Sequence, residues 1–323
     1  MKLTLATVLA ATLATGAVQA QSSIFTGDYT ISAGIGGALP MDRSDRSVII
    51  DNNTSPGPFP GSTLVELLGS DALDYGTGFS GELEFKAGLT FGGSAFIRAD
   101  GMSSNGETGL SFGDSEDGAI PGSYDDGFRT ENGFDNQAEI ESRAFSLAVG
   151  YEHPFANGFT GSVGLMYARV SQDLEINLNP DLSDSARSVA TGEGDNQMGG
   201  LVIGAGYEHA INQSWSVAFS GNAALLANSY DYDYLRVGED GTIDQEADND
   251  GNSTVIRLDA EAKAIYNFRP NTKLTGAIGI TNYSGVSTGL DNLLNEDNTA
   301  TEIEDATTDF TYSYARLGLE ITF

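Results

Sequence analysis

The sequence predicts an all-β fold, a closed antiparallel transmembrane β-barrel of about ten strands. Polar and apolar residues alternate over many short segments, which is the pattern of β-strands with two different faces. The connections between these segments are alternately short and long, as in barrels with tight turns at one end and loops at the other. Glycine (41 residues) is frequent, proline (8 residues) is scarce, and the absence of cysteine excludes disulfides and thiolate metal sites.

The first twenty residues have the three parts of a secretory signal peptide. Lys2 gives a positive start, residues 3–13 are apolar, and Ala17-Val18-Gln19-Ala20 supplies small residues for cleavage. The apolar run is too short to cross about 30 Å of hydrocarbon as a helix. We therefore expect a signal peptide at residues 1–20 and a barrel domain at residues 21–323.

Ten segments of the remaining chain are strand candidates. Short connections follow the second, fourth, sixth and eighth segments, and long ones follow the others. If both termini lie at one end, the number of strands must be even, and ten satisfies this. Extra strands within 44–50 or 107–113 would raise the number to twelve, and residues 63–68 could form a helical turn. The ten segments are 25–39, 77–91, 94–104, 138–152, 159–175, 197–209, 214–229, 253–268, 272–284 and 308–323.

The two faces of these strands differ in a way that indicates a membrane. In segment 253–268, Ile256 and Leu258 share a face with several alanines, and charged residues occupy the other face. Charges inside and apolar side chains outside are expected when lipid surrounds the barrel. The predicted inner-face charges, besides Asp28, are Glu82, Glu84, Lys86, Arg98, Asp100, Arg257, Asp259, Glu261, Lys263, Arg316 and Glu320.

These inner charges leave two states of the lumen open. Pairing across strands would give an ion-pair ladder that stiffens the barrel and fills it, since small barrels can be packed by their own side chains. Small residues at inward positions indicate some open space instead. These are Gly34, Gly36, Gly204, Gly206, Ala224 and Gly279.

Aromatic residues cluster beside the predicted short turns, where they would form a girdle at one membrane interface. They are Tyr151, Phe159, Tyr207, Trp215, Tyr266 and Phe268. The segments Gly150-Tyr151-Glu152-His153 and Gly206-Tyr207-Glu208-His209 also recur, each entering a short turn. We interpret this recurrence as repetition of a hairpin unit and not as a ligand motif.

The C-terminus, Leu317-Gly318-Leu319-Glu320-Ile321-Thr322-Phe323, alternates apolar residues and ends in an aromatic one. In this it resembles Gram-negative outer-membrane barrel proteins. The resemblance implies an integral outer-membrane location and contact with outer-membrane lipid. It also implies that the barrel-assembly machinery recognises Phe323, Ile321 and Leu319. The ending and the glycine-rich hairpins further resemble the Legionella-type major outer membrane proteins, a pore-forming group.

The charge is strongly acidic. Without Lys2, 14 basic residues stand against 46 acidic ones, a net charge of −32, and the five predicted long loops hold 32 of the acidic residues and five arginines. Such a surface repels phosphates, which argues against a nucleic-acid partner, and it attracts cations. A surface that is only solvated and repulsive would have the same acidic composition without a specific function, as would a protein adapted to a saline habitat.

Residues 246–251 resemble the start of a calcium loop, with Asp248 and Asp250 as candidate ligands. The distal glutamate is missing because Arg257 occupies its place, so the sequence predicts at most weakly bound Ca²⁺. Bridging to lipopolysaccharide phosphates would be one use for such ions. No other cofactor is expected.

Two functions remain after these observations. The first is a porin-like channel for small hydrophilic solutes that favours cations. The second is a closed structural or surface-recognition barrel whose acidic loops bind divalent cations, lipopolysaccharide or other surface partners. An enzyme is not expected, because both histidines, His153 and His209, fall at the short turns and no carboxylate pair stands out. The sequence does not predict the solute or the oligomeric state.

Overall fold

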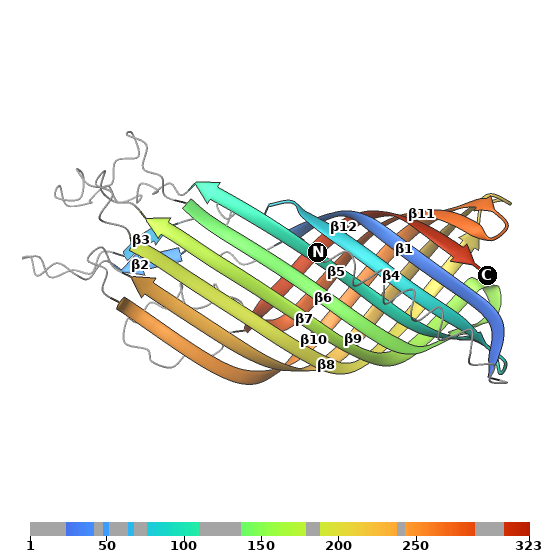
Figure 1. The fold of residues 1–323 in the computed structure, drawn as a ribbon, viewed down its shortest axis with the longest axis horizontal. Coiled ribbons are helices and arrows are strands. Elements are labelled where there is room, and N and C mark those ends of the chain that lie inside the picture. The colour runs from blue at the N-terminus through green and yellow to red at the C-terminus, as the bar shows by residue number, and fades with distance from the viewer. Residues whose placement is uncertain are drawn as a thin grey trace, which may run out of the picture.

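The computed structural model describes residues 24–41, 48–51, 64–67, 76–109, 137–178, 188–237, 243–287 and 307–323. Ten strands of this part close into one antiparallel barrel (Figure 1). The order around the barrel is β1-β12-β11-β10-β9-β8-β7-β6-β5-β4. The strands are β1 Phe25–Met41, β4 Gly78–Leu89, β5 Ser94–Gly109, β6 Gln137–Pro154, β7 Phe159–Leu178, β8 Ser188–Ala210, β9 Trp215–Val237, β10 Ile243–Arg269, β11 Thr272–Ser287 and β12 Thr307–Thr322.

The prediction of a ten-stranded barrel is confirmed, and the alternative of twelve barrel strands is wrong. Two further strands exist, β2 (Val48–Asp51) and β3 (Leu64–Leu67), but they pair only with each other in a separate two-stranded sheet. Residues 64–67 are therefore a strand and not part of a helical turn. Residues 107–109 continue β5, and residues 110–113 lie outside the described part.

The barrel closes between its first and last strands. Gly34 of β1 lies opposite Gly318 of β12, and the backbone N–H of Phe323 donates to the carbonyl of Tyr29 over 2.9 Å. The short turns gather at this end, which faces the periplasm in outer-membrane barrels. The turn between β4 and β5 needs glycine, because Gly92 and Gly93 have φ angles of 97° and 76°. The predicted signal peptide lies outside the described residues.

Several strands extend farther than the alternation predicted. The structure begins β8 at Ser188, ends β9 at Val237 and begins β10 at Ile243. The predicted loops 176–196 and 230–252 therefore consist largely of strand. Charged side chains on the outer face interrupt the alternation of apolar and polar residues in these segments. Strand pairing depends on backbone hydrogen bonds, however, and these continue wherever one strand faces another. Among the described residues, no helix is long and apolar enough to cross a membrane.

The outer face carries an apolar band around the barrel. Many large apolar side chains point outward and are exposed, including Leu165 (60%), Leu201 (62%), Leu225 (60%) and Leu317 (75%). On the inner face, Arg257 (3%) and Arg316 (5%) are buried. An apolar exterior around a charged interior is stable only in lipid. The chain is therefore an integral membrane barrel of the outer-membrane type.

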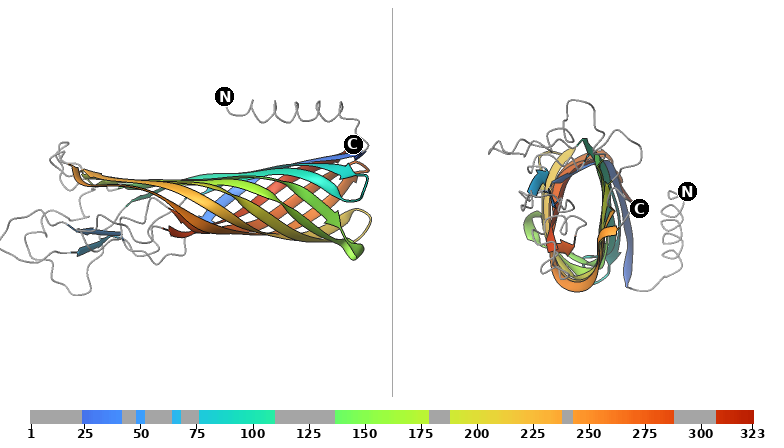
Figure 2. Two further views of the ribbon diagram at one scale, coloured as in Figure 1. Left: turned by 90° about the horizontal axis from the view of Figure 1, so that it is seen from below. Right: turned by 90° about the vertical axis from the view of Figure 1, so that its left-hand side faces the viewer.

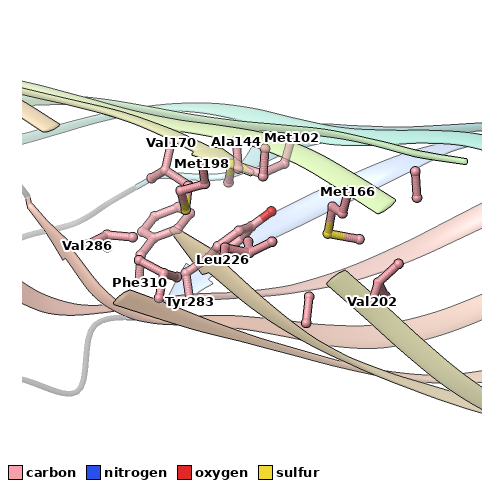
Figure 3. Packing of buried hydrophobic residues seen from close by; sticks show 14 of the residues in the cluster. Met102, Ala144, Met166, Val170, Met198, Val202, Leu226, Tyr283, Val286 and Phe310 are labelled. Carbon is pink, nitrogen blue, oxygen red and sulfur yellow. The ribbon is translucent and has the colours of Figure 1, made fainter. Parts of the chain in front are cut away.

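Side chains fill the long-loop half of the barrel. Seen end-on, the barrel is oval, so two opposite walls approach each other (Figure 2). Buried apolar residues from nine of the ten barrel strands form one cluster there, including Met102, Met166, Met198, Leu226 and Tyr283 (Figure 3). This cluster is a packed core inside the barrel.

Candidate functional site

The structure places the eleven predicted inner-face charges on the inner face and joins all of them in ion pairs. Lys86 contacts Glu152 at 2.8 Å, Arg98 contacts Glu84 at 2.6 Å, and Lys263 contacts Glu261 at 3.1 Å. Lys273 pairs with Glu320 at 2.7 Å, and Arg316 with Glu82 at 3.1 Å. These five pairs have no net charge. Sequence reasoning missed Glu152 and Lys273, although the alternation of their strands would have placed both inward.

One ion pair crosses the lumen. Arg257 on β10 donates from Nη2 to Oδ1 of Asp100 on β5 over 2.9 Å. Five strand-to-strand steps separate β10 from β5 in either direction around the barrel, so the two residues belong to opposite walls. Nη2 also donates to Asp259 over 2.9 Å, and Nη1 donates to the sulfur of Met166 on β7 over 3.4 Å. Arg257 on β10 therefore connects its own strand to β5 and β7 at mid-barrel.

The inward glycines let long side chains reach past a neighbouring strand. A Cβ on Gly279 of β11 would lie 2.4 Å from the ring of Tyr314, which crosses there from β12. The Tyr314 hydroxyl then donates to Glu261 of β10 over 3.1 Å. Gly34 of β1 likewise lies beneath the side chain of Arg316, which extends from β12 to Glu82 of β4.

The prediction that inward small residues indicate open space is therefore wrong at several positions. Neighbouring side chains cover Gly34 and Gly279. A Cβ on Gly204 would lie 2.5 Å from Ser162 Oγ, and Ala224 is only 4% exposed. Small residues here make room for the side chains of other strands.

Above Arg257, toward the long-loop end, the lumen is closed by polar contacts as well as apolar ones. Asn196 on β8 donates to the carbonyl of Ser287 on β11 over 2.6 Å, three strands away. Asn228 donates to Asn196 over 3.0 Å. The hydroxyl of Tyr283 is fully buried and has no hydrogen-bond partner among the described residues. A buried polar atom without a partner lowers the stability of the fold. Its presence therefore indicates a region where close packing outweighs hydrogen bonding.

Below Arg257, toward the short-turn end, water reaches the inner face. The side chains of Lys86, Arg98 and Lys263 are 26%, 29% and 27% exposed. Ser220 faces inward, opposite Gly206 and Glu261, and is nonetheless exposed. The lumen is thus a vestibule that ends at Arg257.

A second cluster lies on the outer face of β6–β10, beyond the apolar band toward the long-loop end. The members of this acidic wall are Glu139, Glu141, Asp173, Glu175, Glu193, Asp195, Asp231, Asp233, Asp248 and Asp250. Five of them are cross-strand neighbours in one row, in the order Glu141, Asp173, Glu193, Asp233 and Asp248. Like charges directly opposite each other destabilise a sheet.

The electrostatics of the acidic wall reflect this crowding. Partial burial and the nearby charges of Glu141 and Asp195 raise the pKa of Asp173 above its usual value. Partial burial and the charges of Asp173, Asp233 and Asp195 raise the pKa of Glu193.

Two arginines offset part of the charge of the wall. Arg143 pairs with Glu141, and Arg169 donates to Asp195 over 2.5 Å. The wall also forms one side of a groove of about 430 Å³. Most residues that line the groove are carboxylates of the wall.

The predicted calcium ligands Asp248 and Asp250 belong to this wall. They lie in β10, where successive side chains point to opposite faces, so the loop geometry of a calcium site is absent from these residues. Within the described ranges, no group of three or more histidine or carboxylate side chains has the arrangement of a metal site. Weak Ca²⁺ binding stays a prediction.

The predicted aromatic girdle lies at the short-turn end. Phe159 packs on Tyr207 with ring centroids 4.8 Å apart, and Trp215 on Tyr266 with centroids 4.9 Å apart. Of the predicted assembly residues, Leu319 and Ile321 lie on the outward face of β12, and Phe323 directly follows the strand and is 66% exposed. Recognition of these residues by the assembly machinery stays a prediction.

No protein-family model and no curated protein sequence matches the chain. Among solved structures, it is similar to the outer membrane protease OmpT from Escherichia coli. The identity is 12%, the match covers 94% of this chain and 99% of that chain, and the TM-score is 0.46. It is also similar to the toluene transporter TodX of Pseudomonas putida (9% identity, 92% and 89% covered, TM-score 0.31).

A third similar structure is a major outer membrane protein from Thermus thermophilus, at 11% identity, with 92% and 99% covered and a TM-score of 0.29. Likenesses this distant carry no conclusion about function. The resemblance to Legionella-type proteins stays a prediction.

Proposed function

We propose that this chain is a closed outer-membrane barrel that acts through its outer surface and does not pass solutes by passive diffusion. The observation that carries the proposal is the contact of Arg257 with Asp100 across the lumen, beneath a packed core that includes Leu226 (0% exposed). A pore for hydrophilic solutes needs a continuous water path. Side chains buried this completely leave no room for a water path at the level of Arg257.

The pairing of the lumen charges supports the same proposal. In each of five ion pairs the positive and the negative charge cancel. The group of Arg257, Asp100 and Asp259 has a net charge of one negative unit. Charges that select ions are aligned or unpaired so that their field acts on the permeating ion. A nearly neutral ladder creates little such field, and it stiffens the barrel.

The acidic wall is the surface through which we propose that the protein acts. It stands just beyond the apolar band, at the level where lipopolysaccharide phosphates meet the outer leaflet. Carboxylates and phosphates repel each other, but Mg²⁺ and Ca²⁺ bind oxygen ligands of both kinds. The wall would therefore hold divalent cations and, through them, lipopolysaccharide. The proposal includes no catalysis, since His153 and His209 lie at the opposite end from the wall.

A cation-favouring porin-like channel remains the second candidate. The observation that favours it is the exposure of inward-facing Ser220, because water already enters the lumen from the short-turn end. A channel would need the core above Arg257 to rearrange.

Single-channel recording separates the two candidates. Protein extracted from outer membranes and shown by circular dichroism to be folded is placed in a planar bilayer under a potassium chloride gradient. The proposal predicts no ohmic steps. Steady steps with a cation-selective reversal potential would reject it and favour the channel.

Cysteine labelling locates the closure, because the chain has no cysteine of its own. A charged thiol reagent should modify Ser220→Cys and leave Leu226→Cys, farther along the inner face of β9 toward the long-loop end, unmodified. Equal labelling of both variants would place water throughout the lumen.

Calorimetric titration with Mg²⁺ tests the acidic wall. The wild-type protein should bind Mg²⁺, and a variant with Asp173→Asn, Glu193→Gln and Asp233→Asn should bind it more weakly. If the variant binds as well as the wild type, the wall is not the cation site.

A further inference from the structure

The two tyrosine–histidine pairs at the short-turn end have a common geometry that the lumen and the acidic wall do not explain. Gly150-Tyr151-Glu152-His153 lies near the end of β6, and Gly206-Tyr207-Glu208-His209 near the end of β8. In both, the tyrosine and the histidine have the same outward orientation as the apolar band. The glutamate between them points inward, where Lys86 contacts Glu152 and Ser216 donates to Glu208.

The hydrogen bonds of the first pair fix the proton of the imidazole. The Tyr151 hydroxyl donates to the carbonyl of Gly92 over 2.9 Å and lies 2.9 Å from Nδ1 of His153. A phenol has one proton, which the carbonyl takes because it can only accept. Nδ1 of His153 must then carry hydrogen and donate to Tyr151. The neutral ring consequently presents an Nε2 lone pair.

The second pair has the same placement, but among the described residues no carbonyl accepts from Tyr207, so the contacts do not fix the tautomer of His209. The Tyr207 hydroxyl lies 3.5 Å from Nδ1 of His209, with the two rings nearly parallel. Aromatic neighbours flank both pairs, since Phe155 meets His153 edge-on at 5.0 Å and Phe159 packs on Tyr207. Within the described part of the chain, no hydrogen bond reaches Nε2 of either histidine.

We propose that the Tyr151–His153 pair, and the Tyr207–His209 pair when His209 adopts the same tautomer, bind the ammonium headgroups of phosphatidylethanolamine in the leaflet at the short-turn end. The pairs stand at the edge of the apolar band, where headgroups lie. An Nε2 lone pair needs a hydrogen-bond donor, and an ammonium group offers three. Aromatic rings beside each site attract a cation. This inference does not depend on whether the lumen is closed.

Lipid competition tests the proposal. The full protein is exchanged into micelles that contain equal amounts of phosphatidylethanolamine, phosphatidylcholine and phosphatidylglycerol, and native mass spectrometry counts the bound lipids. Phosphatidylcholine is the decisive comparison, because its headgroup is cationic but has no N–H. Phosphatidylethanolamine should exceed it by about 2- to 10-fold, the range for one hydrogen bond.

The double variant His153→Phe/His209→Phe keeps the aromatic character and removes the acceptors, so this enrichment should disappear. Tyr266→Phe, a girdle substitution on β10 that packs on Trp215, is the matched control and should retain it. Enrichment that survives in the histidine variant would overturn the proposal, as would equal binding of the two cationic lipids by the wild type. Preference for phosphatidylglycerol would also overturn it, by indicating phosphate recognition.

A second measurement covers the case in which the double variant does not fold. The ¹⁵N shift of Nε2 in the wild-type histidines should move when phosphatidylethanolamine replaces phosphatidylcholine. An unchanged shift would reject the proposed hydrogen bond.

Discussion

Replacement of Arg257 by methionine tests whether the middle of the lumen is a packed interior. Arg257 is 3% exposed, and its loss leaves the carboxylates of Asp100 and Asp259, whose side chains are 12% and 13% exposed, without a cation. Breaking a buried ion pair by removing one partner costs about 3–5 kcal/mol. We therefore expect Arg257→Met to lower the free energy of unfolding by about that amount. Urea titration in lipid vesicles, followed by the fluorescence of Trp215, the only tryptophan, measures it.

Arg169→Met is the matched control. Arg169 also donates to an aspartate, Asp195, but its side chain is 54% exposed and lies outside the lumen. Exposed ion pairs contribute about 0–1 kcal/mol, so this substitution should have little effect. Adding Asp100→Asn and Asp259→Asn to Arg257→Met should restore part of the lost stability, because the two carboxylates that lose their cation are then replaced by neutral amides. If the two arginine substitutions had equal, small effects, the lumen would be solvated at Arg257 and the closed barrel would be refuted.

Three further substitutions test other parts of the interior and the wall. Gly279→Ala should cost about 1–3 kcal/mol of unfolding free energy because its Cβ collides with Tyr314, whereas Gly199→Ala, with open space around its Cβ, should be nearly neutral in the same titration. Tyr283→Phe removes a buried hydroxyl that has no partner among the described residues and should leave the protein equally stable or more stable; a loss above about 1 kcal/mol would indicate a bound water. Asp173→Asn should stabilise the protein at pH 7. Because the folded pKa of Asp173 is raised, its unfavourable contribution is present above that pKa and disappears as the pH falls through it, so the gain should vanish in acid, and a gain independent of pH would contradict this.

The sequence was sufficient for the architecture because the alternation of side chains along a strand has a period of two. The faces of β10 follow directly from it, since every second residue from Ile256 to Ala264 is apolar and the residues between are charged. The ends of β8, β9 and β10 could not be predicted in this way. On a wall outside the membrane, both faces of a strand can be polar, and the contrast that identifies a strand disappears.

The sequence also identified the inner charges without showing how they pair. Asp100 and Arg257 are 157 residues apart and meet only because the barrel is oval and its opposite walls approach (Figure 2). The interpretation of the inward glycines was reversed for another reason, the reach of long side chains from a neighbouring strand. In a round, open barrel Gly34 and Gly279 would border water, but here each is covered by a long side chain that reaches past it.

Carboxylates in the lumen are paired with basic residues, whereas most carboxylates of the acidic wall are next to other carboxylates. This difference supports a role for cations at the wall. Inside, nearly every carboxylate has a basic partner. Outside, Asp173, Glu193 and Asp233 face one another across neighbouring strands. A surface needed only for solubility works best with both signs mixed, and a row of like charges costs stability. A cation that binds only the folded wall repays this cost by mass action, by about 2.7 kcal/mol when its concentration is one hundred times the dissociation constant. In a membrane whose outer leaflet is itself bridged by divalent ions, the wall would share those ions with the surrounding phosphates, and its negative charge would then join the barrel to the leaflet.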